Sequence, residues 1–172
     1  MATPNPERKT VFATPWFQVL EAPSGGKHPN YSINSPDFVC IIAVTENHEL
    51  LLVRQFRHAV GTFTLELPAG HVEKDETPVQ AARKELLEET GYVADTFELI
   101  ADLSPSPARF TNRMWCYFAA NARRAPEAEL EAGMSCVLHT QGLPALLREP
   151  DFYSMGNWAA IMAAVAQGTL QL

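Results

Sequence analysis

The hydrophobic and polar positions of this chain alternate between short apolar runs and stretches of helical spacing. The apolar runs 38–44 and 49–56 predict two paired central strands, since the turn-like segment Thr45-Glu46-Asn47-His48 separates them. One further strand is expected early in the chain and three late, at 12–21, 97–103, 113–119 and 135–139. Helical spacing predicts a final helix at 155–166, after a short helix at 144–148.

The stretch 66–92 has the pattern of a strand, a loop and a long helix. Thr77 suits the N-cap, Pro78 the first helical position, and Gln80 three residues after the threonine completes a capping box. Gly91 is expected to end the helix, because glycine tolerates the left-handed conformation at the C′ position. One face of this helix is apolar and is expected to pack on the core.

Glu85, Glu88 and Glu89 cluster on a neighbouring arc of the same helix. Like charges four residues apart, in the half of a helix that disfavours anions, cost a few tenths of a kcal/mol each, roughly. Local rules broken together suggest a site, and clustered carboxylates suit a hard cation such as Mg²⁺. The alternative is a solvated acidic face that Arg83 and Lys84 neutralise, and spacing alone leaves both interpretations open.

Length and composition predict one globular domain, 1–172, with a loose arm at 1–10 and N-terminal strands at about 11–36. The formal net charge of −7 argues against a nucleic-acid partner, which would require a basic surface. The three scattered cysteines form no metal-binding or disulfide pattern and fit a reducing cytoplasm. No signal peptide or membrane-spanning segment is expected.

The helix belongs to a longer pattern: Gly70, five residues, Glu76, seven residues, Lys84-Glu85-Leu86, one residue, Glu88-Glu89, one residue, Gly91-Tyr92. This pattern closely resembles the Nudix box, the signature of hydrolases that cleave a nucleoside diphosphate linked to another moiety. Lys84 departs from it, because the family has arginine there. The resemblance implies an α+β fold, a Nudix-type α/β/α sandwich with a mixed β-sheet.

The resemblance also assigns roles within the box. It implies that Mg²⁺, with Mn²⁺ as an alternative, is held by the Ala69 carbonyl, Glu85, Glu88 and Glu89, of which Glu88 is a ligand or positions water. It assigns Glu76 to support of the loop, while Gly70 permits close backbone approach. In the family, the arginine at the place of Lys84 orients the box glutamates, a task for which lysine lacks the bidentate fork. A general base is implied in the loop before the last strand, Glu129 or Glu131, with Glu131 preferred.

The segment Arg54-Gln55-Phe56-Arg57, followed by Leu65-Glu66-Leu67-Pro68-Ala69-Gly70, is typical of the ADP-ribose pyrophosphatase branch of that family. In that branch the arginine at the place of Arg57 touches phosphates or ribose. A proline near the place of Pro107 is also shared. The resemblance thus names four substrate-binding residues: Arg54, Arg57, Glu66 and Pro107. The alternative for the arginines is a pair of solvated charges at a strand end.

The leading hypothesis is Mg²⁺-dependent hydrolysis of ADP-ribose, or a similar nucleoside diphosphate sugar, to AMP and sugar phosphate. Two alternatives stay open: a hydrolase of nucleoside triphosphates or dinucleotides, and a non-catalytic domain that senses ADP-ribose. The unusual Lys84 is the feature that favours the second of these. The resemblance also implies a homodimer that uses the N-terminal strands.

Overall fold

The computed structural model describes residues 7–171. Residues 1–6 of the predicted N-terminal arm lie outside this range, and strand β1 (Lys9–Ala13) takes up the last two residues of the predicted arm. In the described part of the chain, no helix has both the length and the apolar character needed to cross a membrane.

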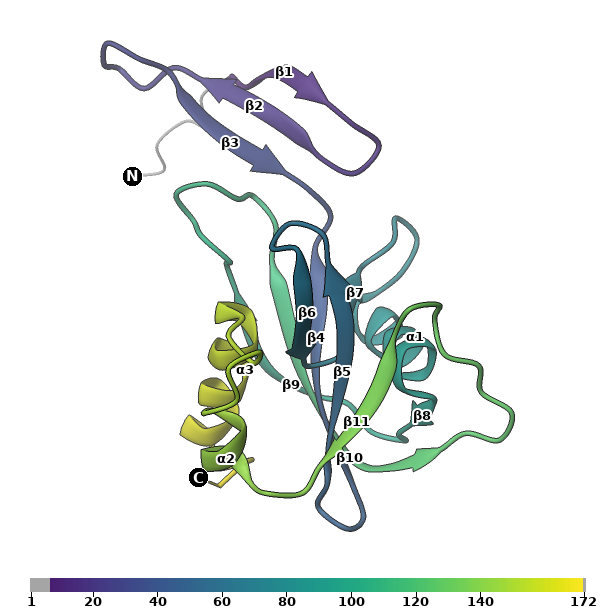
Figure 1. Ribbon diagram of the computed structural model, residues 1–172. Helices are drawn as coiled ribbons and strands as arrows, with labels where there is room; N and C mark the ends of the chain where they lie inside the picture. Colours follow the sequence, from purple (N-terminus) through teal and green to yellow (C-terminus); the bar gives the residue numbers. More distant parts are fainter. Residues whose placement is uncertain (1–6, 172) are drawn as a thin grey trace.

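The N-terminal segment forms a separate three-stranded antiparallel sheet of β1, β2 (Gln18–Ala22) and β3 (Asn30–Asn34). The expectation of one strand over 12–21 is wrong, because a tight turn interrupts it. Thr14 Oγ1 accepts hydrogen bonds from the backbone N–H groups of Trp16 and Phe17, at 3.1 and 3.0 Å. A threonine that bonds its own backbone in this way favours a turn over a strand. Figure 1 shows this sheet beyond one end of the main sheet.

The main sheet has eight strands and is mixed, because only the β4–β10 pair is parallel. Its strands are β4 (Phe38–Thr45), β5 (Leu50–Arg57), β6 (Thr62–Glu66), β7 (Ala69–His71), β8 (Tyr92–Val93), β9 (Glu98–Leu103), β10 (Met114–Arg124) and β11 (Ser135–His139). The helices are α1 (Pro78–Thr90), α2 (Leu143–Leu146) and α3 (Met155–Ala166).

The central strands β4 and β5 are paired less than predicted. Their register contains one pair, Val44 with Leu50, next to the connecting turn. Along most of its length β4 instead pairs with β10 and with β7, while β5 pairs with β6 and β11. Apolar runs locate strands from local sequence, whereas their partners depend on the whole topology.

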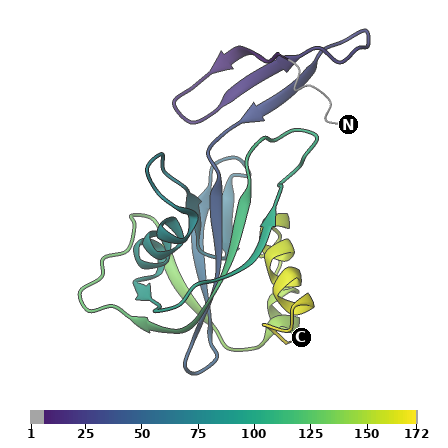
Figure 2. The same cartoon turned by 180° about the vertical axis from the view of Figure 1, so that it is seen from behind.

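Strand β4 shows how the layers form. Val39, Ile41 and Ala43 belong to the apolar cluster around α1, whereas Cys40 and Ile42 belong to the cluster around α3. Successive strand residues point to opposite faces, so a run buried on both sides needs a helix on each. Figures 1 and 2 show α1 on one face and α3 on the other. The predicted α/β/α sandwich with a mixed sheet is confirmed.

Helix α1 has the predicted ends. The backbone N–H of Thr77 donates to Gln80 Oε1 at 2.8 Å, and Gly91 adopts a φ of 73° while its N–H donates to the Leu87 carbonyl at 2.8 Å. Ala82 and Leu86 are buried as expected, but so is the charged residue Glu89. The acidic arc of α1 therefore turns partly inward, against the sheet.

Candidate active site

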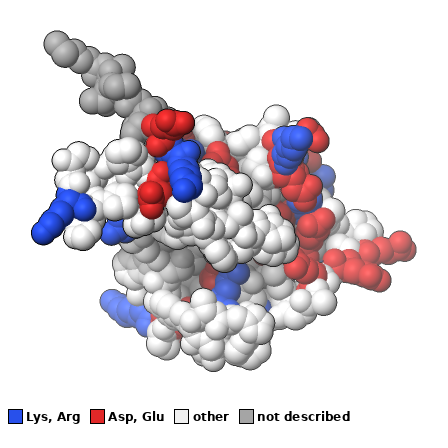
Figure 3. Space-filling model, turned by 90° about the horizontal axis from the view of Figure 1, so that it is seen from above, with Lys and Arg blue, Asp and Glu red and all other residues white. Residues whose placement is uncertain are grey.

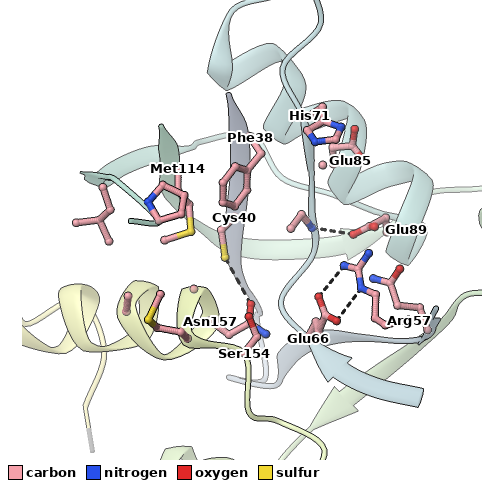
Figure 4. Close-up of a pocket in the computed structure, with 18 of the residues that line it drawn as sticks. Phe38, Cys40, Arg57, Glu66, His71, Glu85, Glu89, Met114, Ser154 and Asn157 are labelled. Atoms are coloured by element: carbon pink, nitrogen blue, oxygen red, sulfur yellow. Dashed lines mark hydrogen bonds and ion pairs between the residues drawn. The ribbon is translucent and has the colours of Figure 1, made fainter. Parts of the chain in front are cut away.

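A cavity of about 700 Å³ lies where β4 and β10 begin, and both helical layers contribute to it. Phe38 and Met114, the first residues of these two strands, form part of its wall. The box loop, α1, the β5–β6 pair, the loop before β11 and the start of α3 supply its polar side chains (Figure 4): Gln55, Arg57, Glu66, His71, Glu85, Glu89, Glu131, Ser154 and Asn157.

The backbone of the box loop approaches α1 closely at Gly70. A Cβ atom added there would lie 2.1 Å from the carboxylate carbon of Glu85, far inside van der Waals contact. Any other residue would push the carboxylate away. This glycine is therefore required by space at the site, as the sequence predicted.

Glu89 is 2% exposed and accepts a hydrogen bond from the Ala69 N–H at 2.8 Å. Burial raises the pKa of Glu89 to about 8, an effect that the Ala69 bond opposes and the nearby charge of Glu85 reinforces. Burial also raises the pKa of Glu85; Lys84 opposes this rise, and Glu88 and Glu131 add to it. A buried and a partly buried carboxyl group thus have raised pKa values, and a bound cation would favour the ionised form of both.

The cavity offers a small set of protein oxygens to a divalent metal. Over residues 7–171, no three His, Cys, Asp or Glu side chains are grouped closely enough to hold an ion by themselves. Mg²⁺ keeps several waters and is commonly held by one or two carboxylates plus substrate phosphates, so Glu85 and Glu89 fit it. Glu88 is exposed and does not line the cavity, and at Ala69 it is the N–H that contacts Glu89.

Arg57 faces the cavity and is held by Glu66. Its Nε and Nη2 donate to the two oxygens of Glu66 at 2.9 and 2.7 Å, and the Thr64 hydroxyl donates to the same carboxylate at 2.6 Å. Although burial alone would raise the pKa of Glu66, the hydrogen bonds from Arg57 and Thr64 lower it, so this carboxylate is ionised. A guanidinium has five N–H donors, and the remaining ones are free to contact a phosphate.

Two of the predicted substrate-binding residues lie elsewhere. Arg54 forms an ion pair with Asp151, in the loop between α2 and α3, and does not line the cavity. Pro107 is exposed and lines a smaller cavity beside the three-stranded sheet, together with Tyr31 and Arg109. Arg54 and Arg57 are three positions apart on β5, and side chains three apart on a strand point to opposite faces.

Lys84 lies among three carboxylates at the outer side of the box. Its Nζ is 2.8 Å from Glu73 Oε1 and 3.7 Å from oxygens of both Glu76 and Glu85. The hydrogen bond to Glu73 is the main reason why the pKa of Lys84 is raised. Glu76 also accepts a hydrogen bond from the Glu73 N–H at 3.2 Å, so it lies where a loop-supporting residue was predicted.

Of the two candidate general bases, the structure places one at the cavity and the other outside it. Glu131 lines the cavity, and its backbone N–H donates to the Glu88 carbonyl at 2.9 Å, which ties the loop to α1. Glu129 is exposed and does not line the cavity. The geometry thus brings Glu131 to the same space as Glu85 and Glu89.

Sequence reasoning missed the contribution of α3. This helix was interpreted as core packing, yet Ser154 and Asn157 line the cavity from its N-terminal end. The available signal was a single asparagine near the start of an otherwise apolar helix. Gln55 and His71 also line the cavity and were not predicted as site residues.

Comparisons with known proteins identify the family of this chain. A NUDIX domain model matches residues 35–140. The chain is 36% identical over 92 residues to an ADP-ribose pyrophosphatase of Bacillus subtilis (strain 168), which covers 54% of this chain and 50% of that protein. It is 35% identical over 130 residues to the ADP compounds hydrolase NudE of Escherichia coli (strain K12). This match covers 72% of this chain and 67% of that protein.

The chain spans about half the length of curated relatives such as the Bacillus protein. Among solved structures, the crystal structure of an ADP compounds hydrolase superposes with a TM-score of 0.79 at 22% identity, covering 99% of this chain and 100% of that one. At this identity the likeness concerns the fold.

Proposed function

Because the chain belongs to the Nudix family, we propose that it hydrolyses the pyrophosphate bond of ADP-ribose or a related nucleoside diphosphate sugar, with Mg²⁺ as cofactor. The observation that carries this proposal is one cavity that joins Glu85, Glu89 and Glu131 to Arg57. Relatives named ADP-ribose pyrophosphatase and ADP compounds hydrolase support the choice of substrate.

Each polar group has a defined task in this proposal. Glu85 and Glu89 hold the metal, which when bound would neutralise phosphoryl oxygens and lower the pKa of a water. Glu66 fixes the guanidinium of Arg57, which orients the diphosphate with its remaining N–H groups. Glu131 accepts the proton of the attacking water, because it faces the same cavity from the opposite loop.

We further propose that two copies of the chain associate through the three-stranded sheet. This sheet and the turn between β1 and β2 expose large apolar side chains: Phe12 on β1 is 54% exposed, and Trp16 in the turn is 72% exposed. Seen from above, the broad centre of the molecule is largely uncharged and acidic side chains gather along one side (Figure 3).

A cytoplasmic location agrees with three free cysteines, Cys40, Cys116 and Cys136.

A substrate panel tests the proposed function. The protein is incubated with Mg²⁺ or Mn²⁺ and with ADP-ribose, other ADP-sugars, dinucleotides and nucleoside triphosphates, and the products are separated by chromatography. We expect AMP and ribose 5-phosphate from ADP-ribose at the highest kcat/KM. Preferred cleavage of triphosphates would contradict the substrate assignment, and tight binding of ADP-ribose without turnover would identify a sensor domain.

A further inference from the structure

The first turn of α3 contains a buried amide whose nitrogen has no hydrogen-bond partner in the part of the chain that the structure describes. Asn157 is 4% exposed, its Oδ1 lies 3.9 Å from the Cys40 thiol, which donates to it, and its Nδ2 is unpaired. Buried polar groups in native proteins are nearly always paired, so an exception calls for an explanation. Asn157 lines the large cavity, so a molecule bound there would explain the unpaired nitrogen.

The surroundings of Asn157 add further donors. Helix α3 has twelve residues, and the N–H groups of its first turn have no partner within the helix. Ser154 occupies the N-cap position, but its hydroxyl makes no capping hydrogen bond, so this group is also available to a ligand. Gly156 lines the cavity as well, and a Cβ there would lie 3.2 Å from Met114 Sδ.

The cavity as a whole also offers acceptors and an apolar wall. Gln55 and Glu66 line it from β5 and β6, and Phe38 and Met114 line it from β4 and β10. In Figure 4, Asn157 and Ser154 lie near Glu66, whereas His71 and Glu85 lie at the far end. Glu66 is paired with Arg57, so it offers acceptor oxygens without a net charge that would attract an anionic group. A neutral ring that carries several hydroxyl groups matches mixed donors and acceptors beside apolar side chains.

We propose that the α3 end of the cavity binds the sugar that lies beyond the pyrophosphate, with Asn157 Nδ2 donating to a sugar oxygen. This proposal rests on the proposed function and deepens it, because it assigns recognition of the sugar to a residue outside the Nudix box. Asn157 then sets specificity and takes no part in the reaction itself.

The test compares two substrates that share one phosphoric anhydride. ADP-ribose carries the sugar, and the methyl ester of ADP carries a methyl group in its place. Asn157→Leu removes the amide at similar volume, and Asn157→Asp keeps the shape but replaces the donor. We expect each variant to lower kcat/KM for ADP-ribose about tenfold, mainly through KM, with the methyl ester changed less than about twofold.

A binding measurement makes the test independent of turnover. Calorimetry in EDTA should show that wild-type protein binds ADP-ribose more tightly than the methyl ester, and that the Asn157 variants lose this difference. If neither compound is cleaved, the proposed function is refuted, and the calorimetric difference still decides the role of Asn157.

The matched control is Asn112→Leu. Asn112 is also buried and also has one unpaired polar atom, Oδ1, but it lies outside the cavity. This variant should not change the ratio of the two substrates. Melting curves identify poorly folded variants, for which Asn157→Ser is the milder replacement. Equal losses on both substrates, or no loss on either, would overturn the proposal.

Discussion

Helix α1 buries an acidic side chain, whereas the N-terminal segment exposes large apolar side chains, and both arrangements are unusual. On α1, Glu89 is 2% exposed, whereas Trp16, in the turn between β1 and β2 of the N-terminal sheet, is 72% exposed. A buried acid is stabilised by a cation, and an exposed cluster of aromatic side chains is stabilised by a surface that covers it. The proposed function gives each region a binding partner: an ion with its substrate at α1, and a second copy of the chain at the N-terminal segment.

The largest expected effect is on turnover. Replacing Glu85 and Glu89 together by glutamine keeps the shape of the box but removes both charges, so we expect kcat to fall by at least about 10²-fold. Steady-state assays with ADP-ribose and Mg²⁺ measure this. Glu98→Gln, an exposed glutamate on β9 outside the cavity, is the control and should retain full activity. A double variant with near-normal kcat would show that α1 bears a solvated acidic face.

The second prediction concerns the other region. Trp16→Ser removes the most exposed large apolar side chain of the N-terminal segment, in the turn between β1 and β2, so the proposed dimer should dissociate into single chains. Light scattering at working concentration gives the mass directly. Met162→Ser, a change at a less exposed apolar residue on α3, is the control and should leave the mass unchanged. Wild-type protein with the mass of one chain would contradict the dimer.

The third prediction compares the acidic region with and without metal. In EDTA above about pH 8, where Glu89 is ionised, the Glu85→Gln, Glu89→Gln double variant should be more stable than wild type by roughly 0.5 to 1 kcal/mol, because a like-charge pair near the helix C-terminus is removed. With Mg²⁺ at a hundredfold excess over Kd, wild type should gain about 2.7 kcal/mol and the variant little, so the order reverses. Parallel shifts of both melting curves would argue against metal ligation by this pair.

The fourth prediction follows from the raised pKa of Glu89. In the folded protein this pKa is about 8, against an ordinary value of 4.5, so the folded state holds the proton more tightly than the unfolded state. The resulting stabilisation is present in full below about pH 4.5 and is lost as pH rises through about 8. Without metal, the melting temperature should therefore fall across this window, on the order of 5 °C. Glu89→Gln should remove most of this fall, and an equal fall in the variant would assign it to other groups.

The sequence predicts the features of the fold that depend on local signals, and it does not predict those that depend on distant parts of the chain. The ends of α1 follow from Thr77, Gln80 and Gly91, and β11 and α3 have the predicted bounds, because caps and periodicity are local signals. The limited β4–β5 pairing was not predictable, since it depends on β10, more than sixty residues further along the chain.

Within the site, the nearness of Glu85 and Glu89 was predictable because their spacing is fixed on one helix, whereas Glu88 of the same arc lies outside the cavity. The approach of Glu131 was inferred only through family resemblance, since the loop that carries it is brought in by tertiary structure. Asn157 was missed because an isolated polar residue in an apolar helix gives no sign of the cavity that it faces. The two arginines of β5 could have been separated by the strand period of two, which sends Arg54 and Arg57 to opposite faces.

The smallest expected effect belongs to Lys84→Arg. Lys84 is a point charge shared by Glu73, Glu76 and Glu85, at 2.8, 3.7 and 3.7 Å. Arginine would carry the same charge on a planar fork that can bond two carboxylates at once, so activity should be equal or higher. Lys84→Met is the informative control: without the cation that lowers the pKa of Glu85, this carboxyl should protonate more readily, and activity should weaken most at low pH. A drop of more than about tenfold for Lys84→Arg, or ~1.4 kcal/mol of transition-state stabilisation, would mean that the three glutamates are spaced for a compact ammonium group.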